Sequence, residues 1–225
     1  MGITLINNEI SDRDFEVKEG EELTLNLAYF DAFKPCKINV KVHKNATLNA
    51  AFADFGKGKG KFEFNVYLEE EGANCNFHSA CLASASDDKV FDTSVYHNAA
   101  HTSAIMSNYG ITRDSSKLVF TGVSEIKKGS IATITRQEAK IIVFDPDCKG
   151  ACSPILKIDE NDVSASHAAT VGRLNEQHLF YLLSRGIDEQ TAKRLITLGY
   201  LKPVEQYFDE EALRENIDKA IEEGI

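Results

Sequence analysis

The 225-residue sequence lacks tryptophan, an excess of positive charge and any long apolar run. Lys and Arg number 25 against 35 for Asp and Glu, giving a formal net charge of -10. Because no basic stripe offsets this balance, nucleic acid and anionic membranes are not expected as partners. No segment approaches the ~20 apolar residues of a membrane helix, and the stretch around Glu9 and Asp12 is too acidic for a secretory signal. We therefore expect a cytoplasmic protein.

A disulfide framework is also not expected. The five cysteines are an odd number and are spread along the chain: Cys36, Cys75, Cys81, Cys148 and Cys152. This pattern is typical of reduced thiols. With 43% apolar and 27% charged residues, the chain can bury a sizeable core in one elongated domain with an appendage.

Short alternating runs dominate the first three quarters of the chain. Residues 37–42, 61–66 and 130–135 each place apolar side chains at every second position. Period-two alternation predicts strands with one buried face.

A loose repeat accompanies these strands. Segments of small and polar residues begin at positions 45, 72, 98 and 129, so they recur every 26 to 31 positions. Such spacing suggests a strand solenoid in which each coil stacks on the one before it. The repeat alone does not distinguish a solenoid from an irregular sandwich.

After Leu174 the pattern becomes helical. Asn175 is a candidate N-cap and Gly186 a candidate C′ residue for a first helix, and Asp188 is a candidate N-cap for a second. The two helices are predicted to form an antiparallel hairpin. A third helix is expected from near Asp209 to the end of the chain. Such short helices need a surface to cover their apolar faces.

Residues 166–187, SHAATVGRLNEQHLFYLLSRGI, join the last strand to the first helix. This stretch resembles the signature of the SufB/SufD family, typically S-H-G-A-T-x-G-x-L-D-E-x-x-L-F-Y-L-x-S-R-G-I. Ala168 stands where the motif has Gly, or Glu in SufB proteins, and Asn175 replaces Asp. The resemblance implies a mainly β fold, with a right-handed parallel β-helix core over residues 1–173 and a helical region over residues 174–225.

Members of this family are scaffolds for iron–sulfur cluster assembly and work with the ATPase SufC. The resemblance therefore implies a scaffold subunit rather than an enzyme, which holds a transient iron–sulfur cluster of unknown type and binds no nucleotide itself. ATP hydrolysis is expected in a separate SufC-type subunit. A second copy or a SufB/SufD paralogue is expected as the dimer partner, and a sulfur donor is a possible further partner.

Two residues carry the expected cluster chemistry. Aligning residues 154–156 with the Pro-Tyr-Ile segment of SufB proteins puts Cys148 at the position of their essential cysteine. His167 stands where SufD proteins have a functional histidine. A thiolate and an imidazole can both ligate iron. Cys152 is a further candidate ligand.

The sequence also departs from both relatives. Ala168 removes the carboxylate that SufB proteins carry after the histidine, and Ala165 replaces a cysteine common in SufD proteins. The chain thus combines a SufB-like Cys148 with a SufD-like His167. A two-fold dimer would bring two copies of each residue to one interface.

The ATPase partner is expected to dock on the first two helices, because the resemblance implies that SufC binds the C-terminal helical region. The apolar residues predicted for this surface are Leu179, Phe180, Leu183, Leu195 and Ile196. The alternative is that the helices cap the open end of the solenoid, which any β-helix must protect. The two interpretations are compatible.

Two other functions stay open at this point. The first is an adaptor of the same fold that holds the ATPase and the partner scaffold but ligates nothing. The second is a β-helix enzyme that acts on polysaccharide, for which carboxylates clustered on strands and aromatic platforms are needed. The lack of tryptophan and the position of the acidic cluster 209–211 in the helical tail argue against that enzyme.

Overall fold

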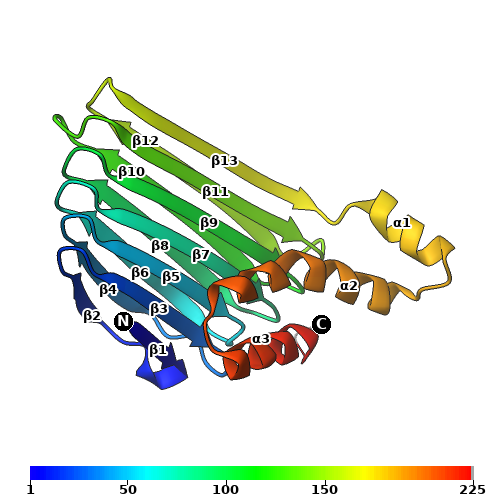
Figure 1. Ribbon diagram of the computed structural model, residues 1–225. Coiled ribbons are helices and arrows are strands. Elements are labelled where there is room, and N and C mark those ends of the chain that lie inside the picture. Colours follow the sequence, from blue (N-terminus) through cyan, green and yellow to red (C-terminus); the bar gives the residue numbers. More distant parts are fainter. Residues whose placement is uncertain (224–225) are drawn as a thin grey trace.

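The computed structural model describes residues 1–223 and consists of a two-sheet solenoid followed by helices (Figure 1). One sheet, called sheet A here, has seven parallel strands: β1 (Gly2–Ile6), β3 (Glu22–Tyr29), β5 (Thr47–Asp54), β7 (Asn74–Ala83), β9 (Ser103–Thr112), β11 (Thr133–Val143) and β13 (Val163–Arg173). The other, sheet B, has six: β2 (Arg13–Val17), β4 (Cys36–Val42), β6 (Lys59–Leu68), β8 (Asp88–His97), β10 (Lys117–Ile126) and β12 (Lys149–Ile158).

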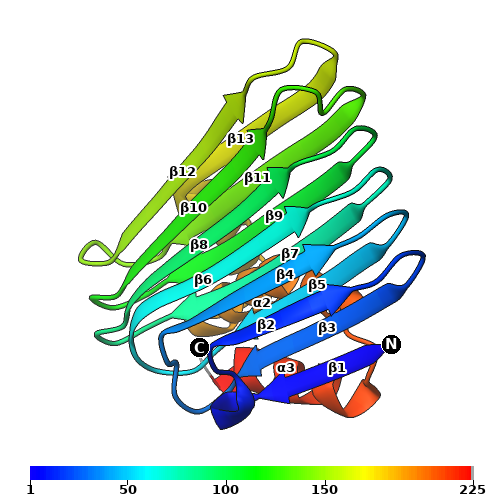
Figure 2. The same ribbon diagram turned by 90° about the vertical axis from the view of Figure 1, so that its left-hand side faces the viewer.

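Successive strands alternate between the two sheets, so each pair of strands forms one coil (Figure 2). All the pairings are parallel, and each strand lies beside the strand two positions earlier in the chain. This topology confirms the β-helix predicted for the core. The alternative of an irregular sandwich is wrong.

The period-two pattern places apolar side chains between the sheets. Phe62, Phe64 and Val66 of β6 are buried, whereas Lys61 lies on the outer surface. Inside the solenoid, the rings of Phe62 and Phe64 continue into a stack with those of Phe52 and Phe77. Stacked apolar rows of this kind are the main source of stability in a narrow β-helix.

The sequence repeat corresponds to the corner that leads from sheet B into sheet A. Shortly before the sheet A strand, one residue of this corner adopts a positive φ in each of five coils: Gly20, Asn45, Gly72, His101 and Ala132, with Gly129 as a second such residue in the last of these corners. In four of these coils that residue donates its backbone N–H to a carbonyl of the next coil, as from Asn45 to Glu71. The strand expected over 130–135 begins only at Thr133, because residues 130–132 form this corner.

A buried ion pair lies on the opposite side of the coils. The ammonium of Lys89 is 2.7 Å from the Oδ2 of Asp54, and both side chains are fully buried. Lys89 also donates to the carbonyl of Gly56, which ties the 55–58 loop to the solenoid wall. Burial raises the pKa of Asp54 to about 6 although Lys89 opposes the shift.

The helices follow the predicted order. α1 (Glu176–Ser184) is capped by Asn175, whose side chain accepts hydrogen bonds from the backbone of Gln177 and His178. α2 (Glu189–Leu201) is capped by Asp188, and is followed by the 3-10 helix η2 (Lys202–Tyr207). α3 spans Glu211–Glu223 and so begins two residues after the expected start near Asp209, while positions 224–225 of the predicted third helix lie outside the described residues. Among the described helices, none combines the length and the apolar character needed to cross a membrane.

The helices do not cap the end of the solenoid. α2 and η2 run back over the outer face of sheet A, towards its N-terminal strands, and α3 follows them (Figure 1). Their apolar side chains pack on small outward-facing residues of sheet A in a second hydrophobic core, which includes Ala51, Ala80, Leu201, Phe208 and Ile217. The expected end cap is therefore wrong for residues 1–223, since the apolar face of these helices is covered by the side of the solenoid.

Candidate functional site

The last coil, formed by β12 and β13, is open on one side. In Figures 1 and 2 these strands form the free edge of the two sheets, and no element of residues 1–223 lies over them. Burial falls accordingly, because every residue of β12 and β13 is exposed or half-buried. The unpaired backbone of two long edge strands is a ready template for pairing with another chain.

His167 lies on the inner face of this open coil. The strand register places it last in one row across sheet A that contains Ala50, Phe77, Met106, Gln137 and His167. The first four residues of the row are buried inside the solenoid, whereas His167 is exposed. Its imidazole is therefore accessible at the mouth of the solenoid, because no further coil of residues 1–223 covers it.

Cys148 has a different environment. It lies in the corner just before β12 and is only 5% exposed. Its Sγ accepts a hydrogen bond from the Thr112 hydroxyl at 3.2 Å. The same Sγ lies 3.2 Å from the Thr112 carbonyl oxygen and 3.1 Å from that of Asp145. These contacts fix the thiol beside a groove whose lining includes Lys149 and Arg173.

Within one chain, Cys148 and His167 do not meet. Cys148 shares its groove with Val171 and Arg173, and His167 precedes Val171 by four positions, a distance of about 13 Å along a strand. The inward-facing Gln137, which lies next to His167 across the sheet, donates to the Ile155 carbonyl in β12. His167 therefore faces the middle of β12 rather than the corner that holds Cys148.

Cys152 is the cysteine nearer to His167 along the coil. It lies on β12 opposite Phe120, faces the interior, and is half-buried. Burial raises the pKa of its thiol to about 11. Cys152 is thus a protonated thiol near neutral pH until a metal or a partner displaces the proton.

The three candidate ligands do not form a closed site: Cys148 lies in the corner before β12, Cys152 on β12 and His167 on β13, in the other sheet. Within residues 1–223, no cluster of three or more His, Cys, Asp or Glu side chains has the spacing to hold a metal ion. Thiolates and an imidazole are soft and borderline ligands that suit iron–sulfur chemistry.

The predicted partner surface lies on α1 and α2, beyond the end of β13 (Figure 1). None of residues 176–184 is buried. Phe180 is 71% exposed, Leu195 is 46% exposed and Leu183 is 39% exposed. Leu179 and Ile196 are half-buried. Tyr181 of α1, which the sequence analysis did not select, is 58% exposed beside them. Clustered exposed apolar side chains of this kind mark interaction surfaces.

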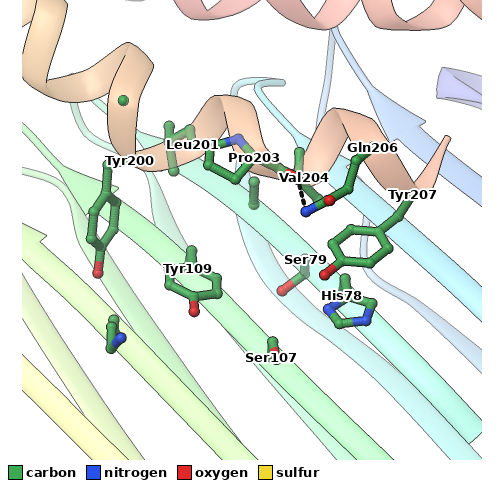
Figure 3. Close-up of a pocket in the computed structure, with 13 residues that line it drawn as sticks. His78, Ser79, Ser107, Tyr109, Tyr200, Leu201, Pro203, Val204, Gln206 and Tyr207 are labelled. Atoms are coloured by element: carbon green, nitrogen blue, oxygen red, sulfur yellow. Dashed lines mark hydrogen bonds between the residues drawn. The ribbon is translucent and has the colours of Figure 1, made fainter.

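A second concave site was not predicted from the sequence. A cavity of about 350 Å³ lies between the outer face of sheet A and the α2–η2 segment (Figure 3). Its lining residues come from β7, β9, β11, α2 and η2, and include His78, Ser107, Tyr109, Tyr200 and Tyr207. No local motif connects these positions, because they converge only when the helices fold back onto the sheet.

The sequence matches a protein-family model over residues 23–200, described as SUF system FeS cluster assembly, SufBD core domain. It is 33% identical over 163 residues to the iron-sulfur cluster assembly protein SufD of Bacillus subtilis strain 168, which covers 72% of this chain and 37% of that protein. It is 25% identical over 227 residues to the SufD protein of Escherichia coli K12, which covers 95% of this chain and 54% of that protein.

An iron-sulfur cluster assembly SufBD family protein of Staphylococcus epidermidis is 25% identical over 162 residues, covering 72% of this chain and 35% of that protein. The chain thus spans between about a third and about half of the length of these curated relatives. The family-model match over residues 23–200 includes the whole open coil with Cys148 and His167.

Proposed function

Because the chain belongs to the SufBD core family of the SUF system for iron–sulfur cluster assembly, we propose that it is a scaffold subunit that holds a nascent cluster where two such chains meet. Its role in cluster assembly follows from the family. The position of the cluster, the second chain and the ATPase are the proposal.

The observation that carries the proposal is the open last coil. β13 has 11 residues and β12 has 10, and both present unpaired edges. A two-fold axis through this end would pair each edge strand with its copy in antiparallel orientation, and would cover the inner face that bears His167. A SufB/SufD paralogue with the same open coil would pair in the same way.

Such a two-fold interface would bring together candidate ligands that lie apart within one chain. Cys152 and His167 face the open side of the coil, and Cys148 lies at its corner. With two chains, each of these residues is present twice. We propose that sulfur and iron are received there as substrates, with thiolates and imidazoles as their ligands.

The ATPase partner is proposed to dock on α1 and the adjoining part of α2. The support is the exposed apolar group formed by Phe180, Leu183 and Leu195. Phe180 and Leu183 lie on α1, which has no buried residue, whereas Leu201 at the end of α2 is buried in the second hydrophobic core on sheet A. The helical hairpin can therefore bind a partner without losing its attachment to the solenoid.

The proposal is tested by co-expression with a SufC-type ATPase under anaerobic conditions, followed by size-exclusion chromatography with iron and sulfide analysis. Co-elution with iron and sulfide is expected. Cys148→Ser and His167→Ala should each reduce bound iron and sulfide, with the ATPase still present. Unchanged iron and sulfide in the double variant would exclude this ligand set.

The docking surface is tested separately in the same experiment. Phe180→Asp should abolish co-elution of the ATPase, because it puts a charge into the apolar surface of α1. Ile105→Asp is the matched control, since Ile105 is also an exposed apolar residue, at 44%, but lies on β9. Equal losses in both variants would argue against a docking site on α1.

One observation favours the adaptor as a second candidate. Cys148 is buried and held by three hydrogen-bonding contacts away from His167. An adaptor would form the same complex but retain no iron or sulfide. Co-elution without either element would therefore support the adaptor.

A further inference from the structure

The cavity between sheet A and the α2–η2 segment has the features of a small-molecule site. Its volume of about 350 Å³ falls within the range of about 300–1,000 Å³ that ligand pockets occupy. It lies where two parts of the fold meet, which is a common location for such sites. The cavity is separate from the open coil and from the exposed surface of α1, so it belongs to neither of the proposed interfaces.

Aromatic side chains form two walls of the cavity (Figure 3). On one side, the rings of Tyr109 and Tyr200 meet edge to face with their centroids 5.6 Å apart. On the other side, the rings of His78 and Tyr207 stack in parallel with their centroids 3.6 Å apart. Ser107 lies between the two sides in the close-up view. Flat walls of this kind suit a planar ring, which can stack or pack edge to face against them.

Several polar groups on these walls are free for a ligand. Ser107, Tyr200 and His78 line the cavity, and none of their side chains has a hydrogen-bond partner among residues 1–223. Hydroxyl groups both donate and accept hydrogen bonds. Burial lowers the pKa of His78 to about 4, so its neutral ring offers one donor and one acceptor near pH 7.

The cavity contains no free charge among its described lining residues. Lys140 is the one lysine or arginine in the lining, and its ammonium is 2.6 Å from the Oε1 of Glu138. The Tyr109 hydroxyl donates to the other oxygen of the same carboxylate at 2.9 Å. Since Glu138 neutralises Lys140, the site offers little attraction for a phosphate or a carboxylate.

We propose that this cavity binds a neutral, planar heteroaromatic compound of about the size of a nucleobase. The ring is held between the Tyr109–Tyr200 pair and the His78–Tyr207 stack. Its ring nitrogens and exocyclic groups bond to Ser107, Tyr200 and His78. Because α2 and η2 form one wall and sheet A forms the other, a bound ring also ties the helical segment to the solenoid.

The first experiment is a titration of the full chain with adenine as the probe, followed by saturation-transfer NMR and calorimetry. We expect saturable binding with a Kd below about 1 mM, as befits a ligand of some ten heavy atoms. Adenosine 5′-monophosphate should bind no more tightly than adenine. An absence of saturable binding, or binding of the monophosphate more than tenfold tighter, would overturn the proposal.

The second experiment locates the bound probe. Ser107→Leu fills the cavity and should weaken adenine binding at least tenfold. Ser164→Leu is the matched control, because it makes the same change at an exposed position of β13 outside the cavity, and it should bind adenine normally. Equal affinities for the two variants would overturn the assignment.

A milder variant keeps the test decisive if Ser107→Leu fails to fold. Tyr200→Phe removes one hydroxyl but keeps the aromatic wall, and should weaken adenine binding severalfold while leaving the circular dichroism spectrum unchanged. Unaltered affinity in Tyr200→Phe would contradict the role given to this hydroxyl. Neither variant alters the open coil, so iron and sulfide retention reports on the cluster proposal independently.

Discussion

Phe77 and His167 occupy the same row of inward-facing positions in sheet A, three strands apart, yet their surroundings are opposite. Phe77 is 1% exposed and stacks on Phe64 across the interior with the ring centroids 4.8 Å apart. His167 is exposed, because β13 is the last strand of its sheet.

The difference shows that one strand pattern has two different surroundings in this chain. In the coils up to β8, the inward-facing residues are mostly apolar and include the stacked aromatic rings of the core. In the last coil the same direction leads to the open mouth, where small residues and candidate ligands replace the aromatic rings. The stacked aromatic rings of the core are thus concentrated in the early coils, and the candidate ligands in the last one.

The comparison is tested most directly by truncating Phe77 and His167 to alanine. Phe77→Ala should lower the free energy of unfolding by about 3–5 kcal/mol, the usual cost of a cavity in an aromatic core. His167→Ala should change it by less than about 0.5 kcal/mol, as expected for an exposed position. Urea denaturation of the isolated chain measures both. Similar losses would mean that the last coil is as tightly packed as the core.

Removal of the buried lysine should have the next largest effect. Lys89→Met leaves the Asp54 carboxylate buried without its partner and should cost about 3 kcal/mol. Asp54→Asn in the same chain should recover part of that loss, because it removes the unpaired charge. If the single variant were neutral, the early coils would not depend on this pair.

The pH dependence of this pair has a definite sign. Burial raises the pKa of Asp54 to about 6 in the folded chain, above the value of about 3.9 in unfolded chains. The folded state therefore binds more protons between these values, and the stability that this group contributes falls as pH rises from about 4 to about 6. Asp54→Asn should remove that slope, which thermal unfolding across this range would reveal.

A smaller effect on the free energy of unfolding is expected at Gln137, which lies between the buried core and the open last coil. Gln137 donates to the Ser124 hydroxyl at 2.7 Å and to the Ile155 carbonyl at 3.1 Å, so it links β11 to β12. Gln137→Leu should cost about 1 kcal/mol. It should also speed amide hydrogen exchange in β12 while leaving β6 and β8 unchanged. Uniform acceleration in all three strands would show that the coils open together.

The smallest effects on stability should come from two ionisable residues, one in the early coils and one in the last coil, which change stability at opposite ends of the pH range. In the early coils, hydrogen bonds to Glu70 and Glu16 raise the pKa of His43. This stabilisation is complete below the unfolded pKa of about 6.5 and is lost as pH rises through the higher folded value. His43→Gln should reduce the fall of the thermal unfolding midpoint as pH rises above neutral.

The last coil should respond in the opposite direction. The backbone N–H groups of Gly129 and Asn161 lower the pKa of Glu160 to about 2. This contribution is present above the unfolded pKa of about 4.3 and is lost as pH falls towards 2. Glu160→Gln should therefore alter stability only on the acid side. A change on the alkaline side in this variant would contradict the assignment.

Much of this architecture could be predicted from local patterns. Period-two alternation located strands such as β6, and the side chains of Asn175 and Asp188 marked the starts of α1 and α2. The family resemblance supplied the solenoid, and the topology confirms it. Residues 130–132 were assigned to a strand because their alternation continues into β11, although Ala132 has the positive φ of the corner.

Long-range contacts could not be predicted in the same way. Small outward-facing residues such as Ala51 and Ala80 leave room for the helices to pack on the outer face of sheet A. A small residue in a strand does not by itself predict such packing, because it can occur there for many other reasons. Periodicity indicates that His167 faces inward, yet it does not reveal that no described coil covers it. The roles of Cys148, Cys152 and His167 as cluster ligands remain predictions.

The regular stacking of coils fixes the distance between the strand that α2 contacts and the open last coil. α2 contacts β9, and β13 is the second strand beyond β9 in the same sheet, which corresponds to roughly 10 Å at the usual strand spacing. The corner hydrogen bonds from each coil to the next keep this spacing constant. An inserted coil between β9 and β13 would place the open coil one strand spacing farther from the strands that carry α2 and η2, and the segment from β13 to α2 would have to span the added distance.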